Sequence, residues 1–310
     1  MNYEELLLKL AEENDKLIIM TAENRAAIRN LPSKIKDRFI DTGIAEQTMV
    51  GMSAGLALRG RIPVLHALST FLTMRAFEFI RTDIGISGLP VKLVGAVAGF
   101  LSEANGPTHQ AIEDIALMRG IPGMNIFCPS DEEELIQGMP AVINDSHPWY
   151  IRYNNMSASV KHTEFEIGKA EKLSTGTDIT FLTYGFLLKE VIAAADILRS
   201  EGISTGVINM RTLKPFDSNA IIQAAKESTL IVPVEDHLIT GGLYSVICET
   251  LIQNHIQAEI MPVALSKWFK PSLLASVLEY EGYTGKALAN KSLVKFQELK
   301  NSKYELTHGR

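Results

Sequence analysis

The chain has 310 residues, of which 46% are hydrophobic and 21% charged, and its formal net charge is −6. This length can hold two domains with a core each, and the acidic balance argues against a general nucleic-acid binder. Its two cysteines, Cys128 and Cys248, belong to no metal-binding cluster, which favours a reducing, cytoplasmic compartment. The acidic start does not resemble a secretory signal, and no apolar run reaches the roughly 20 residues that cross a bilayer.

Strand-like and helix-like segments alternate through the first half of the chain. Apolar runs predict strands at 16–20, 62–68, 91–98, 124–128 and 149–153, and helical patterns lie at 44–58, 71–84 and 110–118. The sequence Ser130-Asp-Glu-Glu133 has the form of a capping box and should begin a helix that runs to about residue 143. Continuous apolar strands between helices predict a mostly parallel sheet covered on both faces.

The pattern fades and then resumes in the second half. Residues 156–177 are polar and are expected to be a linker between a domain at 1–155 and a smaller one at 178–310. Strands are expected there at 179–184, 204–210, 229–234 and 258–263, with helices at 187–199, 217–226 and 243–252. The predicted fold is therefore α/β, with two doubly wound domains and mostly parallel sheets. The polar tail at 297–310 is expected to be partly loose.

Two motifs carry ionisable groups at turns. In Asp-Thr-Gly-Ile-Ala-Glu46-Gln, Glu46 would begin a helix rich in small residues, where the helix dipole favours the carboxylate and burial opposes it. Such a group suits proton exchange with a ring nitrogen, although a helix N-terminal acid without chemistry is the commoner case. In Gly-Pro-Thr-His109, the turn would project His109 toward a cleft, whereas most histidines after a turn are ordinary surface residues.

Two further features fit ligand binding or plain packing. Phe71, Phe77 and Phe79, with Met74, form an aromatic patch that could be a wall for a flat heterocycle or part of the core. Arg152 lies near the carboxyl end of an expected parallel strand, where α/β folds bind ligands, and its guanidinium can fork onto a phosphate. A salt-bridged arginine at a strand end is an equally good explanation.

The order of the motifs Gly-Ile-Ala-Glu46-Gln, Ser-Thr-Phe71-Leu and Gly-Pro-Thr-His109-Gln resembles the transketolase family, which includes deoxyxylulose-phosphate synthase. The resemblance extends over almost the whole chain, with a pyrimidine-binding domain to about residue 153 and the family's C-terminal domain from about residue 178. It implies that Glu46 hydrogen-bonds the aminopyrimidine of thiamine diphosphate and activates this cofactor. Phe71, Met74 and Phe77 would form the pyrimidine pocket, and His109 would face the donor sugar.

The same resemblance implies that Arg152 binds the substrate phosphate. His66 and Arg75 lie near the expected cleft, and His66 is taken as a candidate substrate-binding residue, while neither has an assigned contact. Two positions depart from the family pattern. Asn105 stands where the family has an aspartate that contacts a donor hydroxyl, and Val97 stands where it has a phosphate-facing histidine. Substrate selection would then differ from that of sugar-phosphate metabolism, unless the backbone of this loop makes the contacts.

The family's diphosphate-binding half is not recognisable in the sequence. That half carries Gly-Asp-Gly and a later asparagine that ligates magnesium; this sequence has no Gly-Asp-Gly and begins close to Glu46. The resemblance therefore predicts the small subunit of a split transketolase, with no metal ligand of its own and a larger partner that ligates Mg²⁺ or Ca²⁺, assembled as α2β2. Such an enzyme would transfer a two-carbon ketol unit from a ketose or its phosphate to an aldehyde. The alternatives are the β subunit of a 2-oxo acid dehydrogenase E1-type decarboxylase and a non-catalytic scaffold of the same fold.

Overall fold

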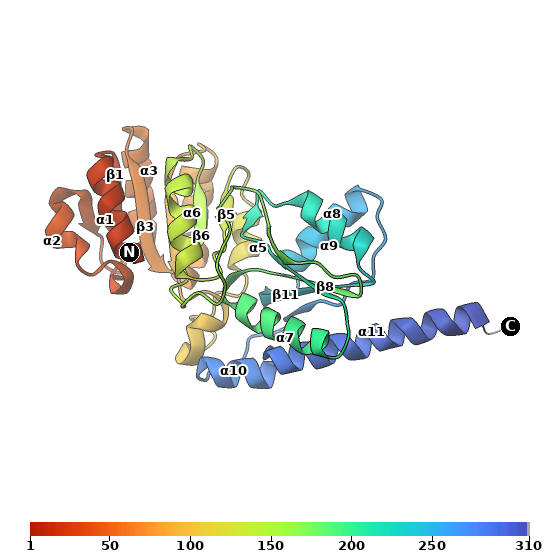
Figure 1. Ribbon diagram of the computed structural model, residues 1–310. Helices are drawn as coiled ribbons and strands as arrows, with labels where there is room; N and C mark the ends of the chain where they lie inside the picture. The colour runs from red at the N-terminus through yellow and green to blue at the C-terminus, as the bar shows by residue number, and fades with distance from the viewer. Residues whose placement is uncertain (309–310) are drawn as a thin grey trace.

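Two sheets, of seven and five strands, form the centres of two α/β domains in the computed structural model, which describes residues 1–308 (Figure 1). Both sheets are mostly parallel, and helices cover their faces. Strands such as β1 and β8 are buried along their whole length, as expected for continuous apolar strands inside such a fold. The α/β class and the two-domain organisation predicted from the sequence are therefore confirmed.

The first sheet has the strand order β10-β5-β6-β4-β3-β1-β2. Its six N-terminal strands pair in parallel and are β1 (Leu17–Thr21), β2 (Phe39–Asp41), β3 (Ile62–Leu68), β4 (Lys92–Ala96), β5 (Asn125–Phe127) and β6 (Trp149–Arg152). The α-helices of this domain are α1 (Tyr3–Glu13), α2 (Leu31–Ile35), α3 (Glu46–Leu58), α4 (Phe77–Phe79), α5 (Asp114–Arg119) and α6 (Glu132–Asn144). Two π-helical segments, Phe71–Arg75 and Ile80–Gly85, flank α4, and short 3-10 turns occupy Ala26–Ile28, Lys36–Arg38 and Gly99–Asn105.

The second sheet has the order β12-β11-β8-β9-β7, with β7 antiparallel at one edge. Its strands are β7 (Glu171–Ser174), β8 (Ile179–Thr183), β9 (Thr205–Asn209), β11 (Leu230–Leu238) and β12 (Val263–Leu265). Its helices are the 3-10 turn Gly185–Leu187, α7 (Leu188–Ser200), α8 (Ser218–Glu227), α9 (Leu243–Gln253), α10 (Leu274–Glu281) and α11 (Gly285–His308). Figure 1 shows α11 running beside α7 and then beyond the body of the domain.

The structure corrects several local predictions. The tail, expected to be partly loose, is helical as far as His308, the end of α11; residues 309–310 lie outside the described residues. The expected linker at 156–177 contains a strand, β7, which extends the second sheet. The last strand is β12 at Val263–Leu265 rather than 258–263. The cap of α6 is Asp131, whose carboxylate accepts from the Glu134 backbone amide, and not Ser130.

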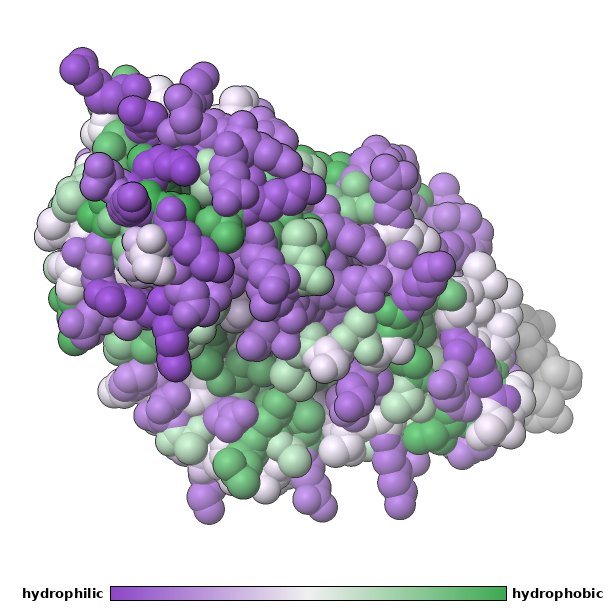
Figure 2. All heavy atoms as spheres, turned by 60° about the vertical axis from the view of Figure 1, so that its left-hand side comes forward, coloured by the Kyte–Doolittle hydropathy of each residue, from purple (hydrophilic) through white to green (hydrophobic). Residues whose placement is uncertain are grey.

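One strand crosses between the domains. β10 (Thr212–Lys214) follows β9 of the second domain but pairs antiparallel with β5 at the edge of the first sheet. It covers an edge that would otherwise expose unpaired backbone groups, and it couples the two domains. None of the described helices has an apolar stretch long enough to traverse a lipid bilayer. The face shown in Figure 2 is mainly hydrophilic, with smaller groups of hydrophobic side chains between the polar ones.

Candidate active site

Glu46 is the first residue of α3 and is almost completely buried, with 2% of its surface exposed. Nη1 of Arg75 donates to its Oε2 at 3.1 Å, while Oε1 has no hydrogen-bond partner within the described part of the chain. The preceding residue, Ala45, offers no side-chain cap to α3, so the Glu46 carboxylate is the first charged group at this helix N-terminus. A buried carboxylate thus has one oxygen fixed and the other open to a ligand.

The π-helical segment 71–75 forms one wall beside this carboxylate. The guanidinium carbon of Arg75 lies 4.1 Å from the centroid of the Phe71 ring, so the same side chain that holds Glu46 also stacks on this aromatic. Met74 and Phe77 are half-buried, and Phe77 packs against the core of the first domain. The two explanations of the aromatic patch are therefore compatible, because Phe77 contributes to the core while Phe71 borders the candidate site.

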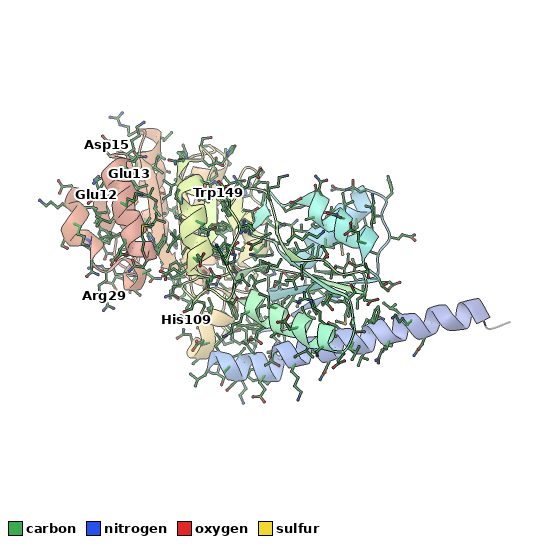
Figure 3. All side chains as sticks on the ribbon, viewed as in Figure 1. Glu12, Glu13, Asp15, Arg29, His109 and Trp149 are labelled. Carbon is green, nitrogen blue, oxygen red and sulfur yellow. The ribbon has the colours of Figure 1, made fainter. Side chains whose placement is uncertain are left out.

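His109 lies on the other side of Phe71. The two rings meet edge to face with their centroids 5.1 Å apart, and the hydroxyl of Thr70 donates to the His109 carbonyl at 2.7 Å. Nδ1 of His109 is 2.9 Å from the hydroxyl of Thr108. Figure 3 shows His109 at the lower margin of the first domain, near α10. The structure therefore brings Glu46, Phe71 and His109 together, as the order of the motifs predicts.

The second domain supports the turn that carries His109. Nε2 of Gln110 donates to the carbonyl of Phe269 at 2.8 Å, and Gly106 has a φ of +84°, which only glycine adopts readily. A Cβ at Gly106 would lie 3.6 Å from Pro271. Asn105, just before this turn, is exposed.

Arg152 is buried between two carboxylates. Its Nε donates to Asp114 Oδ2 at 3.0 Å, and its Nη1 pairs closely with Asp236 at the end of β11 in the second domain. Burial opposes the charge of Arg152, but Asp114 and Asp236 outweigh it and hold the pKa of the guanidinium well above its usual value. Gly99 has a φ of +58°, which favours glycine, and a Cβ at this position would overlap the Asp236 carboxylate. The structure has the salt-bridged arginine that the sequence left as an alternative, and phosphate binding by Arg152 would require this ion pair to open.

His66 also has a packing role in this structure. Its ring is buried, with Nε2 2.9 Å from the Tyr3 hydroxyl and Nδ1 3.3 Å from the Met20 carbonyl. Burial lowers its pKa to about 4, so the imidazole is neutral near pH 7. These contacts attach α1 to β1 and β3 and leave no ring nitrogen of His66 free for a ligand.

The sequence did not reveal a buried charged cluster that joins the domains. His162 lies between Asp131 Oδ2 and Glu171 Oε2, at 2.8 Å from each, and Arg211 pairs with Glu134 at 2.5 Å and with Glu171 at 2.8 Å. Glu134, His162 and Glu171 are close enough to suit a metal. Burial alone would lower the pKa of His162. Its hydrogen bonds to Asp131 and Glu171 outweigh this effect and raise the pKa to about 10. Without a metal, the cluster forms buried ion pairs between segments of both domains.

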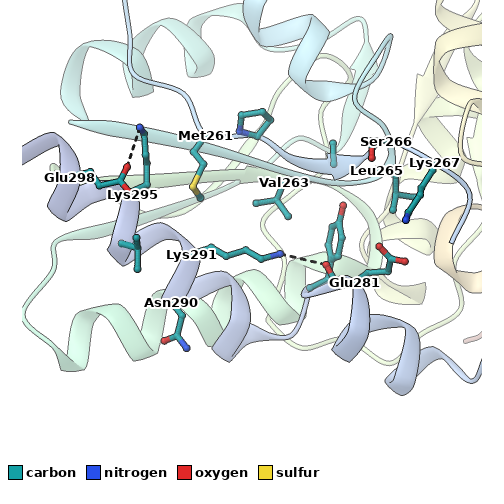
Figure 4. A pocket seen from close by; sticks show the side chains of 14 residues that line it. Met261, Val263, Leu265, Ser266, Lys267, Glu281, Asn290, Lys291, Lys295 and Glu298 are labelled. Atoms are coloured by element: carbon teal, nitrogen blue, oxygen red, sulfur yellow. Dashed lines mark hydrogen bonds and ion pairs between the residues drawn. The ribbon is translucent and has the colours of Figure 1, made fainter. Parts of the chain in front are cut away.

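Two cavities of similar size lie in different domains. One, of about 700 Å³, is at the carboxyl edge of the first sheet. Its lining includes Leu68 and Ala96, the last residues of β3 and β4, and Tyr153, which follows β6. The other, of about 640 Å³, lies between β12 and α11 in the second domain (Figure 4). Of its lysines, Lys295 pairs with Glu298, and Lys291 donates to the carbonyls of Glu281 and Gly282. The first cavity is lined by Leu68, the last residue of β3, and the segment that carries Phe71 continues from this strand end.

Residues 2–159 match the pyrimidine-binding domain of transketolase, and residues 168–287 match the transketolase C-terminal domain. The chain belongs to the transketolase family. It is 35% identical over 81% of its length to the 6-deoxy-6-sulfo-D-fructose transketolase subunit SqwH of Clostridium sp. (strain MSTE9), and covers 80% of that protein. It is also 32% identical over 84% of its length to an apulose-4-phosphate transketolase subunit from Phocaeicola vulgatus, and covers 86% of it.

A solved structure of a split-gene transketolase, described as an inactive β4 tetramer, has 31% identity and a TM-score of 0.87 over 96% of this transketolase-family chain and 97% of that one. Relatives named 1-deoxy-D-xylulose-5-phosphate synthase match as well, and the chain spans 48% of the length of the one from Synechococcus sp. (strain JA-2-3B'a(2-13)). The family and the two domains predicted from the sequence are thus confirmed.

Proposed function

We propose that this chain is the smaller subunit of a split transketolase that depends on thiamine diphosphate and transfers a two-carbon ketol unit from a ketose to an aldehyde. The observation that carries the proposal is the state of Glu46: a buried carboxylate with one oxygen held by Arg75 and the other without a protein partner among the described residues. This arrangement fits a family whose pyrimidine-binding domain covers half of the chain.

The residues present fit the pyrimidine half of the cofactor. Phe71, Met74 and Phe77 offer half-buried apolar surface for a flat ring, and Oε1 of Glu46 is an available acceptor for a ring N–H. When bound, thiamine diphosphate would supply the nucleophilic carbon and the electron sink. Glu46 would hold or exchange the proton at the ring nitrogen, and Arg75 would keep the carboxylate oriented for this exchange.

His109 is the chain's candidate for contact with the donor. Its Nδ1 is engaged with Thr108, whereas Nε2 has no hydrogen-bond partner within the described residues. The turn that carries it is braced by Thr70 in the first domain and by Phe269 in the second. A histidine held in this way can place one ring nitrogen against a substrate oxygen without moving the backbone.

The proposal includes a larger partner that carries the diphosphate-binding domain and ligates Mg²⁺ or Ca²⁺, in an α2β2 assembly. Two relatives matched over most of their length are named as subunits, which supports a divided enzyme. Self-association of the small subunit would use the face of α3 and its neighbouring segment, where Ile44, Met52, Phe79 and Ile86 are exposed. The small residues Ser53 and Ala54 are buried within the domain, whereas Gly55 of α3 is exposed.

The test is to purify the tagged chain from its native host, identify the stoichiometric partner and assay the complex. Ketol transfer from a ketose donor that requires added thiamine diphosphate and both chains supports the proposal. Pyruvate and branched 2-oxo acids, assayed in parallel, distinguish an E1-type decarboxylase, and turnover of these acids without any ketose transfer contradicts the proposal. A complex that binds no thiamine diphosphate would point to the scaffold instead.

A further inference from the structure

We propose that the cleft at the carboxyl edge of the first sheet receives the uncharged, hydroxyl-bearing end of a ketose, and that it disfavours sugar phosphates. This inference rests on the proposed function and names the substrate class for the same site. The cleft has a volume of about 700 Å³, which is enough for a sugar chain. It lies at the carboxyl edge of the sheet, where α/β folds bind ligands, and it is lined by Leu68, the last residue of β3, from which the segment carrying Phe71 continues.

The charge of the cleft is the main observation. Its polar lining includes three carboxylates and three amides, and no lysine, arginine or histidine is among the described residues that line it: Glu4, Glu103, Glu132, Asn2, Asn24 and Asn155. Glu4 and Glu132 are already engaged with the backbone amides of Asn30 and Tyr3, whereas Glu103 has no hydrogen bond to the described residues. A phosphate carries about −1.5 to −2 charges near pH 7 and would be repelled by this lining.

Two arginines that are adjacent in sequence to lining residues of the cleft, Arg152 and Arg25, are both held in ion pairs with carboxylates. Arg152 is the last residue of β6, at the carboxyl edge of the sheet, but its guanidinium is buried in ion pairs with Asp114 and Asp236. Nε of Arg25, next to Asn24 in the sequence, donates to Asp41 at 2.7 Å. Val97, which lines the cleft after β4, adds an apolar side chain at a position with a φ of +55°.

The same lining suits hydroxyl groups. Carboxylates and amide oxygens accept hydrogen bonds from hydroxyls, and amide nitrogens donate to them. Nδ2 of Asn24 is buried and has no hydrogen-bond partner among the described residues, which is unfavourable unless a ligand or water oxygen meets it. Glu103 offers a carboxylate that has no hydrogen bond to the described residues. An uncharged polyol is therefore the ligand that satisfies this cleft without a buried like-charge contact.

The test compares D-xylulose with D-xylulose 5-phosphate as donors for the reconstituted complex, since the two differ only in the phosphate. We expect kcat/KM for D-xylulose to exceed that for the phosphate by about tenfold or more. Added salt should reduce this ratio, because it screens the repulsion of the phosphate and leaves the neutral donor unaffected.

A charge reversal in the cleft provides the matched variant. Glu103→Lys should move the ratio toward the phosphate by about threefold to tenfold, whereas Glu12→Lys, at the far end of α1 (Figure 3), should not move it. A wild-type complex that prefers the phosphate, or a ratio that Glu103→Lys leaves unchanged, overturns this inference alone. A complex that uses neither D-xylulose nor its phosphate but accepts another phosphorylated ketose overturns this inference alone, and a complex that transfers a ketol unit from no ketose overturns the proposed function and this inference with it.

Discussion

Arg75 fixes the carboxylate of Glu46 from the neighbouring helical segment, with Nη1 3.1 Å from Oε2. The arginine is partly exposed while the glutamate is buried, so the ion pair connects the surface of the first domain with the interior of the candidate site. The same guanidinium stacks on Phe71. A single side chain thus sets the positions of the two groups on which the proposed cofactor contacts depend.

Replacing Glu46 with glutamine should lower kcat of the assembled enzyme by about 10²- to 10⁴-fold, the range that positioned proton transfer contributes. The amide has nearly the same shape but cannot take up a proton, so the melting temperature should stay within a few degrees of wild type. The control is Glu78→Gln, an exposed glutamate seven residues after Phe71. Near-normal turnover of the Glu46→Gln complex would remove Glu46 from the mechanism.

Substituting Arg75 tests its positioning role. Arg75→Met removes the bond to Glu46 and the cation above Phe71, and we expect about a tenfold weaker binding of thiamine diphosphate together with a lower kcat. Arg75→Lys keeps a charge and should recover part of the affinity. Arg81→Met, at an exposed position in the next helical segment, is the matched control. If titration calorimetry on the complex gives equal cofactor affinity for Arg75→Met and wild type, Arg75 is not a positioning residue.

The buried ion pair between the domains should matter for stability. Asp236→Asn leaves Arg152 with one carboxylate in a dry site, and we expect the free energy of unfolding to fall by about 3 kcal/mol. Asp196→Asn, which breaks an exposed pair with Arg199, should cost less than about 1 kcal/mol. Urea denaturation of the isolated chain measures both changes, and equal losses in the two variants would contradict an ionic lock at Arg152.

The cluster around His162 predicts a particular pH dependence. Its pKa is raised from 6.5 to about 10 in the folded chain, so its contribution to stability is complete below about pH 6.5 and is lost as the pH rises toward 10. Within this window the stability difference between wild type and His162→Gln should shrink by about 1.4 kcal/mol per pH unit. Urea denaturation between pH 6 and 10 gives the slope. A difference that does not change with pH would mean that His162 is neutral when folded.

Glu171, a carboxylate partner of His162, predicts a change of stability at acidic pH. Burial alone would raise the pKa of Glu171. His162, the Thr163 amide and Arg211 outweigh this effect and lower the pKa to about 2. Its contribution is therefore present above about pH 4.5 and lost as the pH falls toward 2. Glu171→Gln should abolish this acid-side loss, whereas Lys172→Gln, at an exposed neighbour on β7, should retain it as in wild type. Identical acid-denaturation midpoints for the two variants would contradict this contribution of Glu171.

β2 (Phe39–Asp41), which is only partly buried, was not predicted. Most other strands could be predicted because each is a short run of buried apolar residues. β10 could not, since Thr212–Lys214 is a three-residue segment whose pairing with β5 comes from the packing of the domains and not from local pattern. β7 was taken as linker for a related reason. It is polar, and what buries Glu171 is its pairing with His162 and Arg211 from distant segments.

The order of the motifs was enough to select Glu46, Phe71 and His109 as residues of one site. The residues that form ion pairs with Glu46 and Arg152 could not be predicted from the sequence. Asp114 and Asp236 approach Arg152 from different domains, and no spacing in the sequence relates them. Arg75 was noticed without a role because its contact with Glu46 depends on the π-helical turn. His66 was placed near the cleft, whereas α1, which the sequence analysis did not predict, covers it with Tyr3.

The central claim is that this chain holds only the Glu46 side of a cofactor site that a partner completes. Calorimetric titration of thiamine diphosphate with Mg²⁺ into this chain alone, the partner alone and their stoichiometric mixture tests it most directly. We predict tight binding in the mixture, at least about tenfold weaker binding by either chain alone, and a clear loss of affinity in the mixture made with Glu46→Gln. Equal affinity of this chain with and without its partner would contradict the claim.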